Sequence, residues 1–195
     1  MTTLLFEILG GIAEVLQELE KSWALVGGLA VSSYVEPRFT RDIDIAISAA
    51  DDEEAEDFLR SWQAYGYTLD TIIEQDAVDR LATVRTYPSG QERSIVVDLL
   101  FASSGIEPEI GDEARQIEIV AGLTIPVARP GHLFALKLLA ADRDERPQDE
   151  LDLKHLAQIV VDEEREAARR AVRLIEERGF NRGRDLKAML DAHLK

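Results

Sequence analysis

The 195-residue chain contains no cysteine. Disulfide bonds and thiolate zinc sites are therefore excluded, and the composition fits a reducing compartment such as the cytoplasm. Long hydrophobic runs are also missing, so no transmembrane helix is expected. Residues 1–21 carry several glutamates and lack the basic start of a signal peptide. At this length roughly 70% of the unfolded surface can be buried, so we expect a cytoplasmic globular protein that is stable without covalent cross-links.

Basic residues are few: 22 Lys and Arg against 38 Asp and Glu give a net charge of -16. Residues 1–164 hold 33 acidic and 13 basic side chains, whereas residues 165–195 hold 5 and 9. The acidic body should repel polyanions, so the basic tail is the one candidate footprint for RNA. The alternative is that the tail is an ordinary solvent-exposed helical segment that carries charges of both signs.

A glycine pair and a pair of aspartates organise the predicted fold. The apolar segment Trp23–Val26 predicts a strand that runs into Gly27 and Gly28, where a helix should begin. Backbone N–H groups at such a turn form a natural seat for phosphate. After thirteen intervening residues, a polar–apolar alternation runs from residue 42 to residue 47, which predicts a second strand. Because side chains alternate along a strand, Asp42 and Asp44 should share one face.

Two hairpins are predicted further along the chain. Leu81–Tyr87 and Arg93–Phe101 flank a Pro-Ser-Gly turn, and Gln116–Val120 pairs with Leu123–Val127 across Ala-Gly. Within the second strand of the first hairpin, Asp98 is a lone carboxylate between apolar neighbours. A lone carboxylate in a strand that is otherwise apolar makes Asp98 a third candidate acid.

These patterns predict an α+β fold, with a mixed sheet of about five strands backed by helices. We expect a core over residues 1–129 and a helical C-terminal subdomain over residues 130–195, because strands give way to helices near residue 128. Residues 67–75 show no clear pattern. The expected helices span residues 4–20, 29–35, 51–64, 132–141, 147–160, 163–178 and 182–194.

The three aspartates would converge if their two strands were neighbours. Two carboxylates about 4 Å apart repel by about 1 kcal/mol in water and about 4 kcal/mol at an effective dielectric constant of 20. A fold that gathers three of them implies a cation, and oxygen ligands suit Mg²⁺ or Mn²⁺, which also bind phosphate oxygens. The alternative is that Asp42 and Asp44 are ordinary solvent-facing residues of an edge strand.

A glycine pair, an Asp-x-Asp motif and a third acid on a later strand together resemble the signature of the polymerase-β-like nucleotidyltransferase superfamily. Gly28 stands where many members have serine. The resemblance spans about residues 23–101 and implies a nucleotidyltransferase-like sheet. It also implies that Asp42, Asp44 and Asp98 are catalytic metal ligands, and that Gly27 and Gly28 bind the nucleotide.

The C-terminal half is similar to the AbiEii/AbiGii toxin-like nucleotidyltransferases. The similarity lies in a helix with Lys137, then Arg143, then Arg146-Pro-Gln-Asp149. It implies that Lys137 contacts the triphosphate and that Asp149 completes the site. From the residues alone, Lys137 could instead be a snorkelling lysine, and Asp149 an acid favoured in the first turn of a helix. Arg41, just before the Asp-x-Asp motif, either binds phosphate or only screens the aspartates.

The resemblance predicts an enzyme that depends on Mg²⁺ or Mn²⁺ and moves an NMP from an NTP to a hydroxyl group. Asp98 would help to hold or deprotonate that hydroxyl, which the family suggests belongs to RNA (a tRNA 3′ end) or to a protein. A role as a toxin in a toxin–antitoxin or phage-defence system, with a cognate antitoxin, is also implied.

Two alternatives stay open. The missing serine at Gly28 and the short chain favour a non-catalytic NTP-binding or regulatory protein with the same fold. An acidic cleft would instead suit a polycationic small molecule, as in the aminoglycoside nucleotidyltransferases.

Overall fold

The computed structural model describes residues 2–36, 40–75, 78–90, 95–141 and 147–194. Its helices are α1 Thr2–Glu18, α2 Gly27–Ser32, α3 Asp52–Ala64, α4 Glu107–Asp112, α5 Pro130–Ala140, α6 Pro147–Ile159, α7 Asp162–Glu177 and α8 Leu186–His193. Its strands are β1 Trp23–Val26, β2 Asp42–Ile47, β3 Tyr67–Gln75, β4 Arg80–Pro88, β5 Val96–Leu100, β6 Arg115–Val120 and β7 Leu123–Val127.

The strands form one mixed sheet of seven strands, in the order β3-β4-β5-β2-β1-β7-β6. The α+β class is confirmed, and both predicted hairpins form, β4 with β5 and β6 with β7. The expected number of about five strands was too low. Residues 67–75 form the edge strand β3, which sequence alone did not assign because most of its side chains on both faces are exposed. Two parallel pairings, β2 with β5 and β1 with β7, join the hairpins into one sheet.

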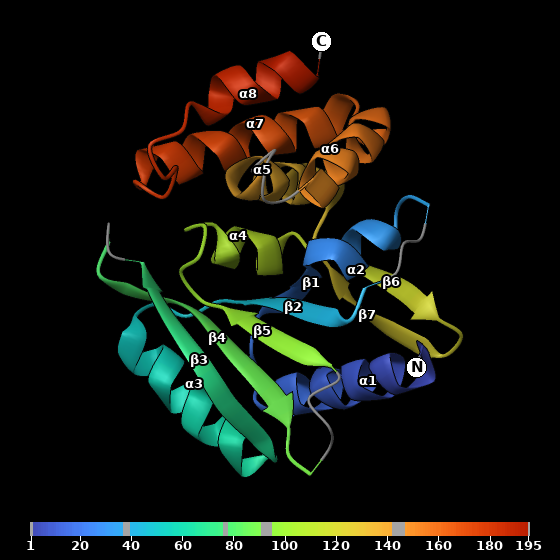
Figure 1. Ribbon diagram of the computed structural model, residues 1–195, viewed down its shortest axis with the longest axis vertical. Helices are drawn as coiled ribbons and strands as arrows, with labels where there is room; N and C mark the ends of the chain where they lie inside the picture. The colour runs from blue at the N-terminus through green and yellow to red at the C-terminus, as the bar shows by residue number, and fades with distance from the viewer. Residues whose placement is uncertain (1, 37–39, 76–77, 91–94, 142–146, 195) are drawn as a thin grey trace.

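The sheet lies between two helical layers (Figure 1). Helices α1 and α3 cover one face, and α2, α4 and the C-terminal helices lie over the other. Helix α1 forms despite its glycine pair, and it contributes three fully buried residues, Leu9, Ile12 and Leu16, to the core. Such burial of an apolar stripe outweighs the roughly 1 kcal/mol that each glycine costs relative to alanine. None of the helices in the described ranges is both long and apolar enough to cross a membrane.

The C-terminal helices pack around α5, which contacts α2, α6, α7 and α8. Their predicted positions are confirmed within a few residues, except that α8 begins at Leu186 rather than at residue 182. The reason is local: Arg182 and Gly183 both adopt positive φ, at 53° and 71°, which a right-handed helix does not allow. Helix α4 was not predicted at all. It spans six residues and is held to β1 and β2 through buried Ile106 and Ile110.

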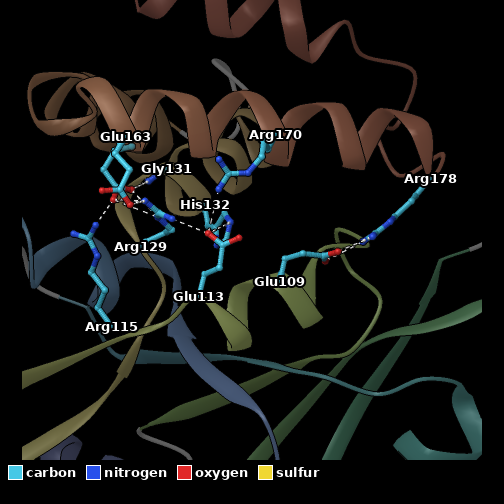
Figure 2. Close-up of polar contacts among 10 residues, drawn as sticks. Glu109, Glu113, Arg115, Arg129, Gly131, His132, Glu163, Arg170 and Arg178 are labelled. Atoms are coloured by element: carbon cyan, nitrogen blue, oxygen red, sulfur yellow. Dashed lines mark hydrogen bonds and ion pairs between the residues drawn. The ribbon is translucent and has the colours of Figure 1, made fainter.

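An ion-pair network with a buried centre joins the C-terminal helices to the rest of the molecule (Figure 2). Its centre is Arg129, which precedes α5 and is only 8% exposed at its side chain. Arg129 pairs with Glu113 after α4 and with Glu163 at the start of α7, each at 2.7 Å. It also pairs at 2.9 Å with buried Glu164, which accepts from Arg115 of β6 as well. The network therefore ties α5 and α7 to α4 and to the sheet.

Replacing Arg129 by methionine should destabilise the fold strongly. The change leaves Glu164 buried beside one cation instead of two, and breaking a buried pair costs about 3–5 kcal/mol. Urea denaturation would measure the loss. The matched control is Arg60→Met, which breaks exposed pairs with Glu56 and Asp57 on α3 and should cost less than about 1 kcal/mol. Equal losses in the two variants would contradict a structural role for the network.

Candidate active site

The glycine turn forms as predicted: β1 ends at Val26 and α2 begins at Gly27. Gly27 has a φ of +68°, in the left-handed region that side chains disfavour. A Cβ at this position would also lie only 1.9 Å from Oδ2 of Asp44. Gly27 is therefore required both by the backbone conformation and by the close approach of the carboxylate. The glycine turn and the Asp-x-Asp motif are in direct contact.

The two strands that carry the three aspartates are parallel neighbours. In their register Asp44 lies directly opposite Asp98, and Asp42 lies one pleat away on the same face. All three side chains line one cavity of about 660 Å³, a volume typical of small-molecule sites. The other predicted site residues in its lining are Gly27, Gly28, Lys137 and Asp149.

One predicted site residue, Arg41, is not brought to this cavity. Arg41 is exposed, and it is not among the residues that line the cavity. The two arginines of the C-terminal motif, Arg143 and Arg146, lie outside the described residues. The structure thus assembles the acids, the glycine turn and the lysine of the predicted site.

The environment of Asp44 strongly disfavours its charged form. Burial raises the pKa of Asp44 to about 7, with further contributions from the negative charges of Asp98 and Asp42. Lys137 and Arg85 act in the opposite direction and only partly compensate. The site in its metal-free form therefore carries an unbalanced negative charge that a bound cation would relieve.

Lys137 is held between two carboxylates of the neighbouring helix. Its Nζ lies 2.6 Å from Oδ1 of Asp149 and 2.8 Å from Oδ2 of Asp152, both on α6. Lys137 is 8% exposed and Asp152 only 1%, so the alternative of a lysine that snorkels to solvent is wrong. Nor is Asp149 only a helix-start acid, because it pairs with a side chain of α5.

Arg85 of β4 is a cavity residue that the sequence analysis missed. Its Nε and Nη2 donate to Oδ1 and Oδ2 of Asp98 at 2.9 and 2.8 Å. The signal was present, since Arg85 lies in the first strand of the predicted hairpin. Its pairing with Asp98, however, depends on the register between β4 and β5, which the sequence does not reveal.

A second group that was missed lines the cavity from the C-terminal side. Ser103 and Ser104 follow β5, and their backbone N–H groups donate to Oε1 of buried Glu107 at 2.9 and 2.7 Å. Arg182, in the turn before α8, also lines the cavity and donates to the carbonyl of Ser103 at 3.3 Å. The turn between α7 and α8 thus forms part of the site.

The donor set fits a divalent cation that is shared with a ligand. Carboxylate oxygens suit Mg²⁺ or Mn²⁺, and the close packing of Asp44 on Gly27 fixes one carboxylate in place. Within the described ranges, however, no three His, Asp or Glu side chains form a ready-made metal cage. Phosphate oxygens and water would therefore have to supply the remaining ligands, as is common for Mg²⁺.

Comparison with known families decides the assignment of the fold and its chemistry. A family model described as nucleotidyl transferase AbiEii toxin, type IV TA system, matches residues 12–194. This chain belongs to the AbiEii nucleotidyltransferase toxin family. It is accordingly a transferase, which confirms the resemblance found in its motifs.

Solved structures support the same fold at low sequence identity. The antibiotic-resistance factor ANT(2'')-Ia is 15% identical with a TM-score of 0.58, over 98% of this chain and 97% of that one. An antigenic nucleotidyltransferase-like protein from Paracoccidioides brasiliensis is 18% identical with a TM-score of 0.52, over 98% and 94%. At these identities the likeness establishes the fold alone. No curated protein matches the chain in sequence.

The raised pKa of Asp44 predicts a pH-dependent stability. The pKa is about 7 in the fold and about 4 in an unfolded chain, so stability is lost as pH rises through this window. In EDTA, Asp44→Asn should therefore melt several degrees above the unsubstituted protein at pH 8.5, with a clearly smaller difference at pH 5. Thermal melts across pH would test this, with Asp191→Asn on the exposed side of α8 as the control. A gap that is independent of pH would contradict it.

Proposed function

We propose that the protein is a metal-dependent nucleotidyltransferase that moves an NMP from an NTP to an acceptor hydroxyl. The observation that carries the proposal is the alignment of Asp44 opposite Asp98 across β2 and β5, beside the glycine turn and Lys137 in one cavity. Family membership supports the transfer of a nucleotidyl group. Metal dependence follows from the charge of the carboxylates, which is unbalanced without a cation.

Asp42 and Asp44 would hold the cation, and Asp98 would hold or deprotonate the attacking hydroxyl. When bound, the cation supplies charge neutralisation and polarises the phosphate oxygens. A bond forms between the acceptor oxygen and the α-phosphorus, the bond to the bridging oxygen breaks, and pyrophosphate leaves. The proton of the acceptor hydroxyl passes to a carboxylate oxygen of Asp98 in this scheme.

The triphosphate would lie between the glycine turn and α5. Backbone N–H groups of Gly27 and Gly28 open α2 toward the cavity, where they can donate to phosphate oxygens. The ammonium group of Lys137 carries three donors, so it can hold Asp149 and Asp152 and still reach a phosphate oxygen. Charge that develops on the leaving pyrophosphate is thereby stabilised by groups already in position.

The acceptor in this proposal is a hydroxyl of RNA or of a protein, and the protein acts as the toxin of a pair with a cognate antitoxin. Helix α7 presents Arg169 and Arg173 one turn apart on its exposed side. The turn that follows α7 brings Arg182 to the cavity, and in this proposal RNA runs from Arg169 and Arg173 along α7 toward the site. RNA bound on this path would have its end near the carboxylates.

A small cationic acceptor is a second candidate. It is favoured by the acidity of the cavity, which four aspartates line. The antibiotic-resistance factor ANT(2'')-Ia shares the fold over nearly its whole length.

Radiolabelled NTPs, offered in turn with Mg²⁺ and with RNA, protein or aminoglycoside acceptors, test the proposal directly. We expect label to be transferred to one acceptor class, and Asp44→Asn to lower the rate at least about 100-fold, because it removes charge that acts in the transition state. Asp191→Asn should retain full activity. Undiminished transfer by Asp44→Asn would overturn the assignment, and the absence of both transfer and NTP binding would favour a non-catalytic protein.

The double charge reversal of Arg169 and Arg173 to glutamate tests the RNA path. Loss of two phosphate contacts should raise the KM for RNA about tenfold or more, while the KM for the NTP stays unchanged. Arg60→Glu is the control, because it lies on α3, which covers the opposite face of the sheet (Figure 1). An unchanged KM for RNA in the double variant would exclude α7 as the footprint.

A further inference from the structure

A row of facing residues crosses the sheet at the cavity. In the register of the strands, Thr71 of β3 lies opposite Arg85 of β4, Arg85 opposite Asp98 of β5, and Asp98 opposite Asp44 of β2. All four line the same cavity. The guanidinium of Arg85 is therefore placed directly beside the facing carboxylates of Asp98 and Asp44.

The contact between Arg85 and Asp98 occupies both oxygens of the carboxylate. Nε donates to Oδ1 at 2.9 Å and Nη2 donates to Oδ2 at 2.8 Å, which is the two-pronged geometry that makes arginine–carboxylate pairs strong. The side chain of Asp98 is 13% exposed, so solvent competes little for it. A cation that is to use Asp98 must share these oxygens or displace the guanidinium.

The remaining acids form an incomplete set for a cation. No three His, Asp or Glu side chains in the described part of the chain are arranged as a metal cage. With Asp98 held by Arg85, a cation near Asp42 and Asp44 has two protein carboxylates and also faces the positive charge of Arg85. Divalent cations of this kind bind weakly to so few protein ligands unless phosphate oxygens complete the shell.

We infer that Arg85 is a positioning residue that holds Asp98 in the free protein and makes binding of the divalent cation depend on the nucleotide. The inference rests on the proposed function and deepens it, because it sets the order in which metal and NTP enter the site. The side chain of Arg85 is 45% exposed, so it can withdraw toward the cavity mouth when a cation and a triphosphate arrive. Lys137 cannot withdraw in this way, since it is buried between Asp149 and Asp152.

The test is the binding of Mn²⁺ alone to the free protein, followed by the EPR signal of unbound Mn²⁺. Arg85→Gln removes both the clamp on Asp98 and the repelling charge, so its affinity for Mn²⁺ alone should rise about tenfold. Arg85→Lys keeps the charge but cannot grip both oxygens, and it should show an intermediate gain. In the unsubstituted protein, a non-hydrolysable NTP should raise the affinity for Mn²⁺ about tenfold or more.

Two controls locate the effect. Arg80→Gln breaks another arginine–aspartate pair that involves β4, the one with Asp52, and it should leave Mn²⁺ binding unchanged. Adding Asp98→Asn to Arg85→Gln should reduce the gain, because the released carboxylate is then missing and only the removal of the repelling charge remains.

The outcomes separate this inference from the proposed function. If the unsubstituted protein binds Mn²⁺ with an NTP, yet Arg85→Gln binds Mn²⁺ alone no more tightly, the inference is overturned and the proposed function stands. Tight binding of Mn²⁺ alone by the unsubstituted protein would likewise overturn it. If no variant binds Mn²⁺ with any NTP and no label is transferred, the proposed function fails, and the inference fails with it.

Discussion

The parallel pairing of β2 with β5 is the constraint on which the site depends. It sets Asp44 opposite Asp98, although the two residues are 54 positions apart in sequence. Because side chains alternate along strands, a register shift of one residue would turn Asp98 into the apolar core and destroy the site. Buried Ile43 and Ile45 on β2, and Val97 and Leu99 on β5, resist such a shift, since they would be forced into the polar cavity.

The surroundings stabilise the charged groups of the ion-pair network but destabilise the charged form of Asp44 in the site. The network around Arg129 and Glu164 joins opposite charges, and it gains from being complete. The site does the reverse: burial and like charges raise the pKa of Asp44, and the opposite charges nearby only partly compensate. Unbalanced charge of this kind is typical of functional sites rather than of structural ion pairs. The ion-pair network, which ties α5 and α7 to the sheet, holds the helix of Lys137 in place over the site.

Local patterns were enough to predict most of the elements and the faces of their strands. Alternation along β2 placed Asp42 and Asp44 on one face, and Asp98 stood out as a lone carboxylate in β5. The glycine turn after β1 was recognised from its position between a strand and the Asp-x-Asp motif. The order of strands was beyond these signals, because it depends on contacts between distant segments. Arg85 was missed for the same reason, and β3 because an exposed edge strand shows little alternation. Helix α4 is too short to show a helical period.

The two cations beside the carboxylates differ in their freedom to respond to a ligand. Lys137 is buried and held by two acids of α6, so it offers a fixed charge to whatever enters the cavity. Arg85 is nearly half exposed at its side chain and is held by one acid. Rearranging Lys137 would break two buried ion pairs, at a cost of several kcal/mol, whereas Arg85 can turn toward solvent. Adjustment to an incoming ligand is therefore expected on the β4 side of the cavity, with the helical side as the rigid template.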